Sequence, residues 1–285
     1  MRKIELLSPA KDLICGIEAI NHGADAVYIG APRFSARVAA GNEIGDIEKL
    51  CNYAHNFGAK VHVALNTILT DNELKECEML IKQLYEVGVD VLIIQDLGLL
   101  TLNLPPLELH ASTQMDNRTP EKVKMLENLG FNRVVLAREL SISEMAKIRQ
   151  QTNIELEAFV HGALCVSCSG QCYLSQAAVG RSANRGACAQ LCRLPYTLTD
   201  ANDNVLLHDK HLLSLKDMNR SDYIEDMILA GISSFKIEGR LKEVEYVKNV
   251  TAFYRQKIDS VLEKLNCEKS SFGKITYHFT PNPVK

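Results

Sequence analysis

The sequence predicts an α/β protein, a (β/α)8 TIM-like barrel with a Cys-rich insertion after the seventh strand. Three observations lead to this fold class. The chain has 285 residues, of which 46% are hydrophobic and 24% charged, a composition typical of globular proteins and a length that suits one large α/β domain. Short apolar runs alternate with amphipathic segments from the first residues onward. Several amphipathic segments end at a glycine shortly before the next apolar run, as in the helix-to-strand step of parallel α/β folds.

The predicted strands are short, apolar and rich in β-branched residues. In chain order they span residues 4–7, 26–29, 61–65, 91–94, 107–111, 133–137, 155–160 and 234–237. The predicted helices span residues 12–21, 47–56, 71–87, 120–129, 143–151, 222–229 and 244–265. Eight such strands indicate a closed barrel. A doubly wound open sheet is the structural alternative, but Ser8-Pro9-Ala10 occupies the turn where that fold carries its Gly-rich phosphate loop.

The alternation breaks after the seventh strand, over residues 161–219. This stretch lacks a clean helical period, carries five of the nine Cys, and contains a hairpin-like segment at 196–207. A long insertion after a barrel strand lies over the C-terminal face, where TIM-barrel active sites are built. We therefore expect a single barrel domain over residues 1–285, with the functional loop at 161–219.

Composition excludes several classes of protein. The net charge is −3, which gives no overall reason to expect nucleic-acid or membrane binding. No apolar run approaches the roughly 20 residues needed to span a bilayer, and the N-terminal residues lack a signal-peptide core. These features indicate a cytoplasmic protein whose thiols stay reduced, so the Cys residues are not expected to form a disulfide framework.

The clustered Cys residues are the strongest chemical signal. They are Cys165, Cys168, Cys172, Cys188 and Cys192, on a backbone rich in Gly and Ser. These intervals allow several thiolates to converge on one point, as a zinc ion or an iron–sulfur cluster requires. Spacing alone leaves zinc and cluster equally open. Buried, inert thiols are the alternative, but the polar neighbours of these residues would make a poor core.

The same stretch lacks acidic residues. Between residues 158 and 199 there is no Asp or Glu, whereas Arg181, Arg185 and Arg193 are present. Their charge would offset that of a thiolate-ligated centre and could attract a phosphate. We predict these three residues, together with Arg138, as substrate-binding.

Polar residues at the predicted strand ends are expected to face the barrel mouth. They are Glu5, Tyr28, Asn66, Gln95, His110, Gln114, Arg138, Glu139, His161, Lys236, Glu238 and Arg240. Arg and Lys at this position could clamp a small carboxylate or an RNA phosphate. The predicted catalytic residues among them are His110, Glu139, His161, Lys236, Glu238 and Arg240.

Motifs along nearly the whole chain resemble those of the collagenase-like peptidase family U32. They lie at residues 6–10, 22–30, 108–114, 160–165, 169–172, 188–196 and 234–240. Within the family, segments 180–186 and 192–198 are most similar to members that hydroxylate a cytidine of 23S ribosomal RNA.

The resemblance implies a barrel carrying a four-iron four-sulfur cluster on Cys165, Cys172, Cys188 and Cys192, with Cys168 as an extra thiol. Some relatives take a ligand from a later Lys-Asp-Leu-Cys motif, which here reads Lys216-Asp217-Met218-Asn219 and has no thiol. The resemblance also implies that the protein takes part in RNA hydroxylation linked to prephenate, a small dicarboxylate. Such a reaction needs redox chemistry that side chains lack.

Two other functions are compatible with the resemblance. The first is a collagenase-type peptidase, although the sequence has no His-Glu-x-x-His or Gly-x-Ser-x-Gly motif and offers only Cys168 with His161 as a nucleophile and base. The second is a cluster-bearing subunit that acts with a partner protein. Residues 277–285 resemble the point where relatives continue into further C-terminal domains, so the chain is expected to be either a shortened member or part of a longer one.

Overall fold

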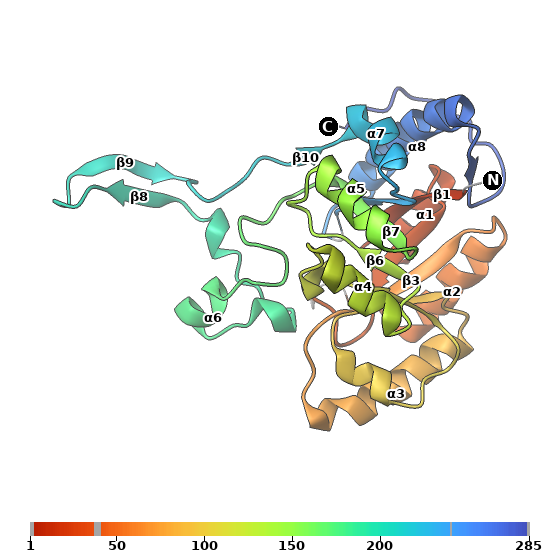
Figure 1. Ribbon diagram of the computed structural model, residues 1–285, viewed down its shortest axis with the longest axis horizontal. Coiled ribbons are helices and arrows are strands. Elements are labelled where there is room, and N and C mark those ends of the chain that lie inside the picture. Colours follow the sequence, from red (N-terminus) through yellow and green to blue (C-terminus); the bar gives the residue numbers. More distant parts are fainter. Residues whose placement is uncertain (1–2, 37–40, 240, 284–285) are drawn as a thin grey trace.

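Eight parallel strands form a closed barrel in the computed structural model, which describes residues 3–36, 41–239 and 241–283 (Figure 1). The barrel strands are β1 (Lys3–Ala10), β2 (Ala26–Gly30), β3 (Lys60–Leu65), β4 (Val91–Ile94), β5 (Glu108–Ala111), β6 (Arg133–Val135), β7 (Glu155–Gly162) and β11 (Ser234–Ile237). Each pairs with its neighbour in chain order, and β11 pairs with both β7 and β1. All eight predicted strands and the predicted fold class are confirmed.

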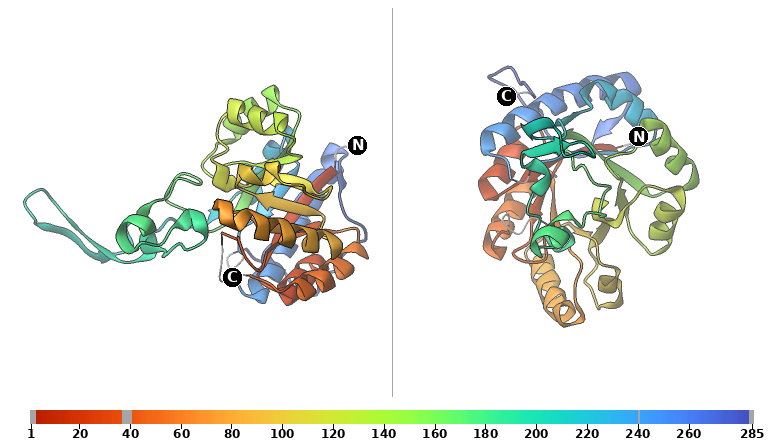
Figure 2. Two further views of the ribbon diagram at one scale, coloured as in Figure 1. Left: turned by 90° about the horizontal axis from the view of Figure 1, so that it is seen from below. Right: turned by 90° about the vertical axis from the view of Figure 1, so that its left-hand side faces the viewer.

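Helices surround the barrel, as the view along its axis shows (Figure 2, right). They are α1 (Leu13–Asn21), α2 (Ile44–His55), α3 (Asp71–Glu86), α4 (Pro120–Asn128), α5 (Ile142–Gln151), α7 (Ile224–Leu229) and α8 (Val244–Leu265). The seven predicted helices are therefore present. A short 3-10 turn, η2 (Leu97–Thr101), connects β4 to β5 in place of a full helix.

Local sequence explains where these helices begin and end. The side chain of Asp12 accepts a hydrogen bond from the backbone of Cys15 at the start of α1, and Ser141 forms a capping box with Glu144 at the start of α5. Both caps satisfy backbone N–H groups that the first helical turn leaves unpaired. At the other end, α4 is followed by Gly130 with φ of 92°, a conformation that glycine adopts without strain.

Strand residues alternate between two buried environments. In β3, Val61, Val63 and Leu65 pack outward against the helices, whereas His62 and Ala64 point into the barrel, since side chains alternate along a strand. The main apolar core therefore lies between the strands and the helices. None of the helices in the described residues is both long and apolar enough to cross a membrane.

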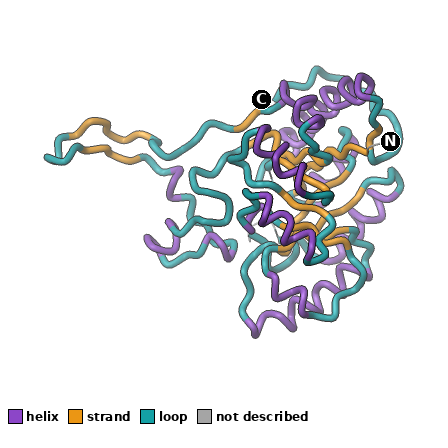
Figure 3. Tube along the Cα trace, viewed as in Figure 1, coloured by secondary structure: helices purple, strands orange, loops and turns teal. Residues whose placement is uncertain are grey.

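The insertion leaves the barrel at the C-terminal end of β7. It contains α6 (Leu174–Val179), η4 (Ala183–Arg185), η5 (Leu191–Arg193) and the antiparallel pair β8 (Tyr196–Thr199) and β9 (Val205–Lys210). Figures 1 and 3 show that the hairpin β8–β9 projects away from the barrel, and every residue of β9 is exposed. The predicted hairpin is confirmed. The chain then returns through β10 (Met218–Asn219), which pairs antiparallel with β7.

Candidate active site at the barrel mouth

Four of the clustered Cys residues converge beside the barrel mouth. Cys165, Cys188 and Cys192 line a groove of about 410 Å³, and Cys172 joins Cys165, Cys168 and Cys188 at an adjacent cavity of about 90 Å³. Burial is the main cause that raises the pKa of Cys192. Arg193 opposes this effect, and the three neighbouring thiolates raise that pKa further. The four predicted ligands therefore gather around Cys192 and two adjoining cavities.

The fifth thiol has a different neighbour. The Sγ atom of Cys168 lies 3.6 Å from Nη1 of Arg118, whose Nη2 donates a hydrogen bond to Asp116. Cys168 lines the 90 Å³ cavity together with Cys165, Cys172 and Cys188, and its contact with Arg118 is the feature that sets it apart from the four predicted ligands.

Two contacts hold the Cys loop, the part of the insertion from residue 165 to residue 192, against the barrel. Ser169 donates hydrogen bonds from its backbone N and its Oγ to the carboxylate of Glu139, at 3.0 and 2.9 Å. The next residue, Gly170, has φ of 75° and approaches the backbone of Gln114 closely. Glu139, which was predicted to be catalytic, therefore anchors the loop.

The predicted substrate-binding arginines of the insertion are engaged within the protein. Arg181 donates to the backbone oxygen of Ala187, and Arg193 donates to the Leu164 oxygen and to Ser214 Oγ. Arg185 donates to the Ile68 oxygen at 2.8 Å and forms an ion pair with Glu73 on α3 at 2.7 Å. These contacts order the insertion, and a role of the three arginines in substrate binding stays a prediction.

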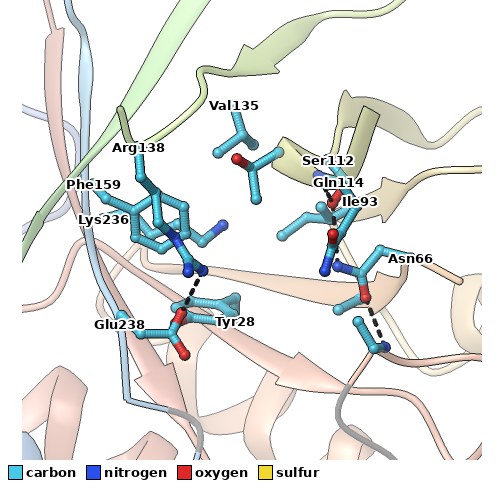
Figure 4. A pocket seen from close by; sticks show the side chains of 13 residues that line it. Tyr28, Asn66, Ile93, Ser112, Gln114, Val135, Arg138, Phe159, Lys236 and Glu238 are labelled. Atoms are coloured by element: carbon cyan, nitrogen blue, oxygen red, sulfur yellow. Dashed lines mark hydrogen bonds and ion pairs between the residues drawn. The ribbon is translucent and has the colours of Figure 1, made fainter. Parts of the chain in front are cut away.

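The mouth itself contains a small polar cavity of about 40 Å³ (Figure 4). Arg138 lies on one side, with Nη2 3.2 Å from Oε2 of Glu238 and its guanidinium carbon 4.3 Å from the ring centre of Phe159. Lys236 lies deeper, with Nζ 4.4 Å from the ring centre of Tyr28. A cavity of this size holds a few water molecules. Arg138 and Glu238 also line the 410 Å³ groove, so they connect the mouth with the Cys residues.

Below the mouth, the barrel interior contains a layer of titratable side chains. Glu5, His62, His110 and Glu157 come from the alternate strands β1, β3, β5 and β7, and each is at most 5% exposed. TIM-barrel interiors are built in such four-residue layers, but bulky apolar residues usually fill them. The rings of His62 and His110 meet edge to face, with centres 5.1 Å apart.

Buried cations neutralise the two carboxylates of this layer. Lys236 Nζ lies 2.7 Å from Oε1 of Glu157, and Arg133 Nη1 lies 3.2 Å from Oε2 of the same residue. Arg133 also forms an ion pair with Glu5. Burial raises the pKa of Glu157, but the charges of Lys236 and Arg133 outweigh it and lower this pKa to about 2. The carboxylate is therefore ionised at neutral pH.

The two imidazoles of the layer are uncharged at neutral pH. Burial is the largest cause that lowers the pKa of His62, to about 4, and it also holds the pKa of His110 well below its ordinary value. His62 was not predicted as a site residue. It could have been found, because a His in a predicted barrel strand is a polar residue in a segment otherwise made of apolar ones.

Several residues expected at the mouth lie elsewhere. Glu5 and His110 belong to the interior layer, because their strands turn these side chains inward below the mouth. The register between β7 and β11 shifts after the pair Phe159 and Lys236. Beyond this shift His161 contacts Tyr254 of α8, with Nδ1 3.3 Å from the hydroxyl, and burial lowers its pKa. Arg240 lies outside the described residues.

Comparison with known proteins places these observations in context. The sequence model of Peptidase family U32 matches residues 11–279. A protein of Escherichia coli K12 named 23S rRNA 5-hydroxycytidine C2501 synthase is 53% identical over 284 residues, which cover 99% of this chain and 44% of that protein. The chain thus spans less than half the length of this relative.

Two other relatives carry different names. The tRNA hydroxylation protein P1 of Bacillus subtilis is 37% identical over 269 residues, covering 91% of this chain and 64% of that protein. A collagenase of Porphyromonas gingivalis is 32% identical over 272 residues, covering 90% of this chain and 66% of that protein.

One solved structure has a similar fold. The U32 peptidase Mk0906 superimposes with a TM-score of 0.53 and 14% sequence identity, covering 84% of this chain and 93% of that one. At this identity the similarity concerns the fold alone.

Proposed function

The chain belongs to peptidase family U32, and from this premise we propose that it takes part in the hydroxylation of a cytidine in 23S ribosomal RNA. Two features support the proposal. The E. coli relative named for this reaction is 53% identical over nearly the whole chain. The groove of about 410 Å³ is lined both by Cys165, Cys188 and Cys192 and by the mouth residues Arg138 and Glu238. The groove carries the proposal, because it puts a candidate redox centre beside a polar pocket.

We propose a four-iron four-sulfur cluster on Cys165, Cys172, Cys188 and Cys192. The position of these thiols around two adjoining cavities supports a shared centre. Among the described residues, the one trio of His, Cys, Asp or Glu ligand atoms within 4.8 Å of one another lies in the barrel interior. No three of the described Cys thiols lie this close together, a spacing that is compatible with a four-iron cluster. When bound, the cluster supplies the redox chemistry that the side chains lack.

The groove also has the size and charge to hold a substrate. Its volume falls in the range of small-molecule sites, whereas the 40 Å³ mouth cavity is too small for a nucleobase or a dicarboxylate. Arg138, Arg193 and Lys242 line it, so a phosphate or a carboxylate, such as those of prephenate, would meet positive charge there. Glu238 contributes a carboxylate to the lining of the same groove, and we propose it as the general acid or base.

The decisive experiment compares the 23S rRNA nucleosides of cells with and without the gene by mass spectrometry. We expect one cytidine to lose a mass of about 16 Da, that of one oxygen atom, when the gene is deleted. The complete gene restores it, and so does a Cys168→Ser version, whereas a Cys172→Ser version does not. Unchanged nucleosides in the deletion strain would contradict the proposal. Since ribosomal RNA is the proposed substrate, we place the protein in the cytoplasm.

The experiment also separates two rival functions. A peptidase would need a nucleophile, but Cys168 contacts Arg118 and His161 contacts Tyr254, so these two residues do not form a pair. A cluster-bearing subunit would restore the nucleoside only together with a second protein. Hydroxylation of rRNA by the purified complete protein alone would identify a self-sufficient enzyme, whereas a cluster-bearing subunit would be inactive without its partner.

A further inference from the structure

The titratable layer inside the barrel contains polar atoms without partners. Both ring nitrogens of His62 and the Nδ1 atom of His110 are buried and make no hydrogen bond. The two side chains are 0% and 1% exposed. A buried polar group left unpaired costs about 1–3 kcal/mol, and such groups in native proteins commonly mark an ion or a water molecule. Three unpaired nitrogens on two neighbouring rings therefore call for a shared partner.

The third member of this arrangement is a carboxylate. One ligand atom from each of His62, His110 and Glu157 lies within 4.8 Å of the other two. These residues come from β3, β5 and β7, so their side chains converge from three sides of the barrel. We propose that they bind one divalent first-row transition-metal ion, such as Zn²⁺ or Fe²⁺, inside the barrel. Two imidazoles and one carboxylate are the donors that such ions favour.

The required adjustment is small. Metal–ligand distances of about 2.0–2.1 Å put the ligand atoms of a tetrahedral ion roughly 3.4 Å apart. The three atoms must therefore approach one another by about 1.4 Å at most, which side-chain torsions can supply.

Neighbouring residues lie close to two of the three ligands. Oε2 of Glu108 lies 3.8 Å from Nε2 of His110, and Lys60 holds the Glu108 carboxylate at 3.1 Å. The distance from Oε2 to Nε2 is longer than a hydrogen bond, and a closer approach of the carboxylate would leave Nδ1 of His110 to face a metal, as around most metal-binding histidines. Ser234 Oγ lies 3.1 Å from Oε2 of Glu157 and 2.9 Å from Oε1 of Glu5, so its single proton is shared between the two carboxylates.

Lys236 competes with the ion for Glu157. Its Nζ contacts Oε1 of that carboxylate at 2.7 Å, and each carboxylate oxygen has two lone pairs, so the ion and the lysine can share the group. Their charges repel, however, and Arg133 adds another positive charge. Removing the Lys236 charge should therefore tighten metal binding, an effect opposite to that of removing a ligand.

The ion would have a structural role and does not depend on the proposed RNA reaction. His62, His110 and Glu157 are absent from the linings of the mouth cavity and of the Cys groove. A metal at this position joins three barrel strands that are not adjacent in the sheet.

The test uses the complete protein, with its Cys centre first filled anaerobically. Co²⁺ is then titrated as the probe, bound metal is counted by mass spectrometry, and visible absorption reports the ligands. We expect the wild-type protein to bind one further equivalent of Co²⁺, and the absorption spectrum to lack the near-ultraviolet band of a thiolate ligand. The melting temperature of the protein should rise on Co²⁺ binding. His62→Phe, which keeps a ring against His110, and Glu157→Gln should each weaken binding on the order of 100-fold, whereas Lys236→Met should tighten it about 10-fold.

His208→Gln is the control, because His208 is an exposed histidine on β9 and its loss should leave binding unchanged. Circular dichroism checks that each variant is folded, and either ligand variant alone suffices if the other does not fold. The proposal is wrong if the wild-type protein takes up no further equivalent, or if a folded ligand variant binds it as tightly as the wild type.

Discussion

Gly170 packs so closely against Gln114 that a Cβ atom on Gly170 would lie 2.0 Å from the Gln114 carbonyl oxygen. The obstacle is backbone, which cannot move aside as a flexible side chain can. This contact presses the Cys loop onto the end of the barrel, next to the hydrogen bonds from Ser169 to Glu139.

We therefore expect Gly170→Ala to lift the loop and to lower the iron content of anaerobically reconstituted protein several-fold. Gly180→Ala is the matched control. Gly180 also has a positive φ, of 69°, but no atom lies within 4 Å of its Cβ position, so it carries backbone strain of about 1 kcal/mol without the clash. Equal iron contents in the two variants would show that the contact does not hold the centre together.

Substitution of single Cys residues tests the proposed ligand set. Cys172→Ser should abolish the broad visible absorption of the reconstituted protein, because a serine hydroxyl is a poor ligand for iron–sulfur clusters. Cys168→Ser should keep both the absorption and about four iron atoms per chain, since Cys168 faces Arg118. A colourless wild-type protein with one zinc ion would refute the cluster.

Arg138 should matter for the reaction and not for the metal centre. It lines both the mouth cavity and the groove, and a charged group that positions a substrate is worth about 100-fold in rate. We expect Arg138→Gln to reduce cytidine hydroxylation by about that factor, as measured by nucleoside mass spectrometry, with unchanged iron content. Lys257→Gln, on the exposed side of α8, serves as the control. Loss of iron in Arg138→Gln would indicate a structural role instead.

A buried ion pair holds α8 to the barrel. Arg255 is 2% exposed, and its Nη1 lies 2.8 Å from Oδ2 of Asp25, which is fully buried. Removing one partner of such a pair costs about 3–5 kcal/mol. We expect Arg255→Met to lower the free energy of unfolding by about that amount in urea denaturation. The double variant Asp25→Asn/Arg255→Met should recover part of this loss, because it leaves no buried charge unpaired; the second partner of Arg255, Asp259, is half exposed.

Stability should decrease in mild acid. The pKa of His62 is about 4 in the folded chain, against 6.5 for an exposed histidine. Because the unfolded chain binds the proton more readily, stability is fully present above pH 6.5 and falls as the pH drops from 6.5 toward 4. His62 alone accounts for about 3 kcal/mol of this change, and His110 acts in the same direction.

Urea denaturation of metal-free protein between pH 7.5 and 4.5 measures the effect. His62→Phe should show a shallower loss of stability over this interval. An identical pH dependence in the variant would mean that His62 is not the group that titrates.

The sequence predicts the barrel well, because its strands and helices are local patterns. Short apolar runs predict all eight strands. The insertion is predicted because the alternation of these runs with amphipathic segments stops after the seventh strand. The helix α6 was not predicted, since its six residues are too short to show a helical period. The convergence of Cys165, Cys172, Cys188 and Cys192 agrees with their spacing, and their role as ligands stays a prediction.

The interior layer is harder to predict, because it depends on barrel closure. Arg133 and Glu5 are 128 residues apart in the chain, and only the closed sheet brings them together. His161 shows a second difficulty. Its side chain was expected at the mouth, but after the register shift between β7 and β11 it packs against Tyr254 of α8. Irregularities of this kind have no clear signal in the strand sequence.

The position of β11 has a consequence for how the chain is made. Glu5 on β1 pairs in register with Ser234 on β11, so the barrel cannot close on a ribosome until the last strand has emerged. Seven strands and the whole Cys loop are synthesised before that moment, while the edges of β1 and β7 are still unpaired. Exposed strand edges favour aggregation. The nascent chain therefore passes through an open, aggregation-prone sheet. A chaperone that shields the edges of β1 and β7 would raise the yield of folded protein.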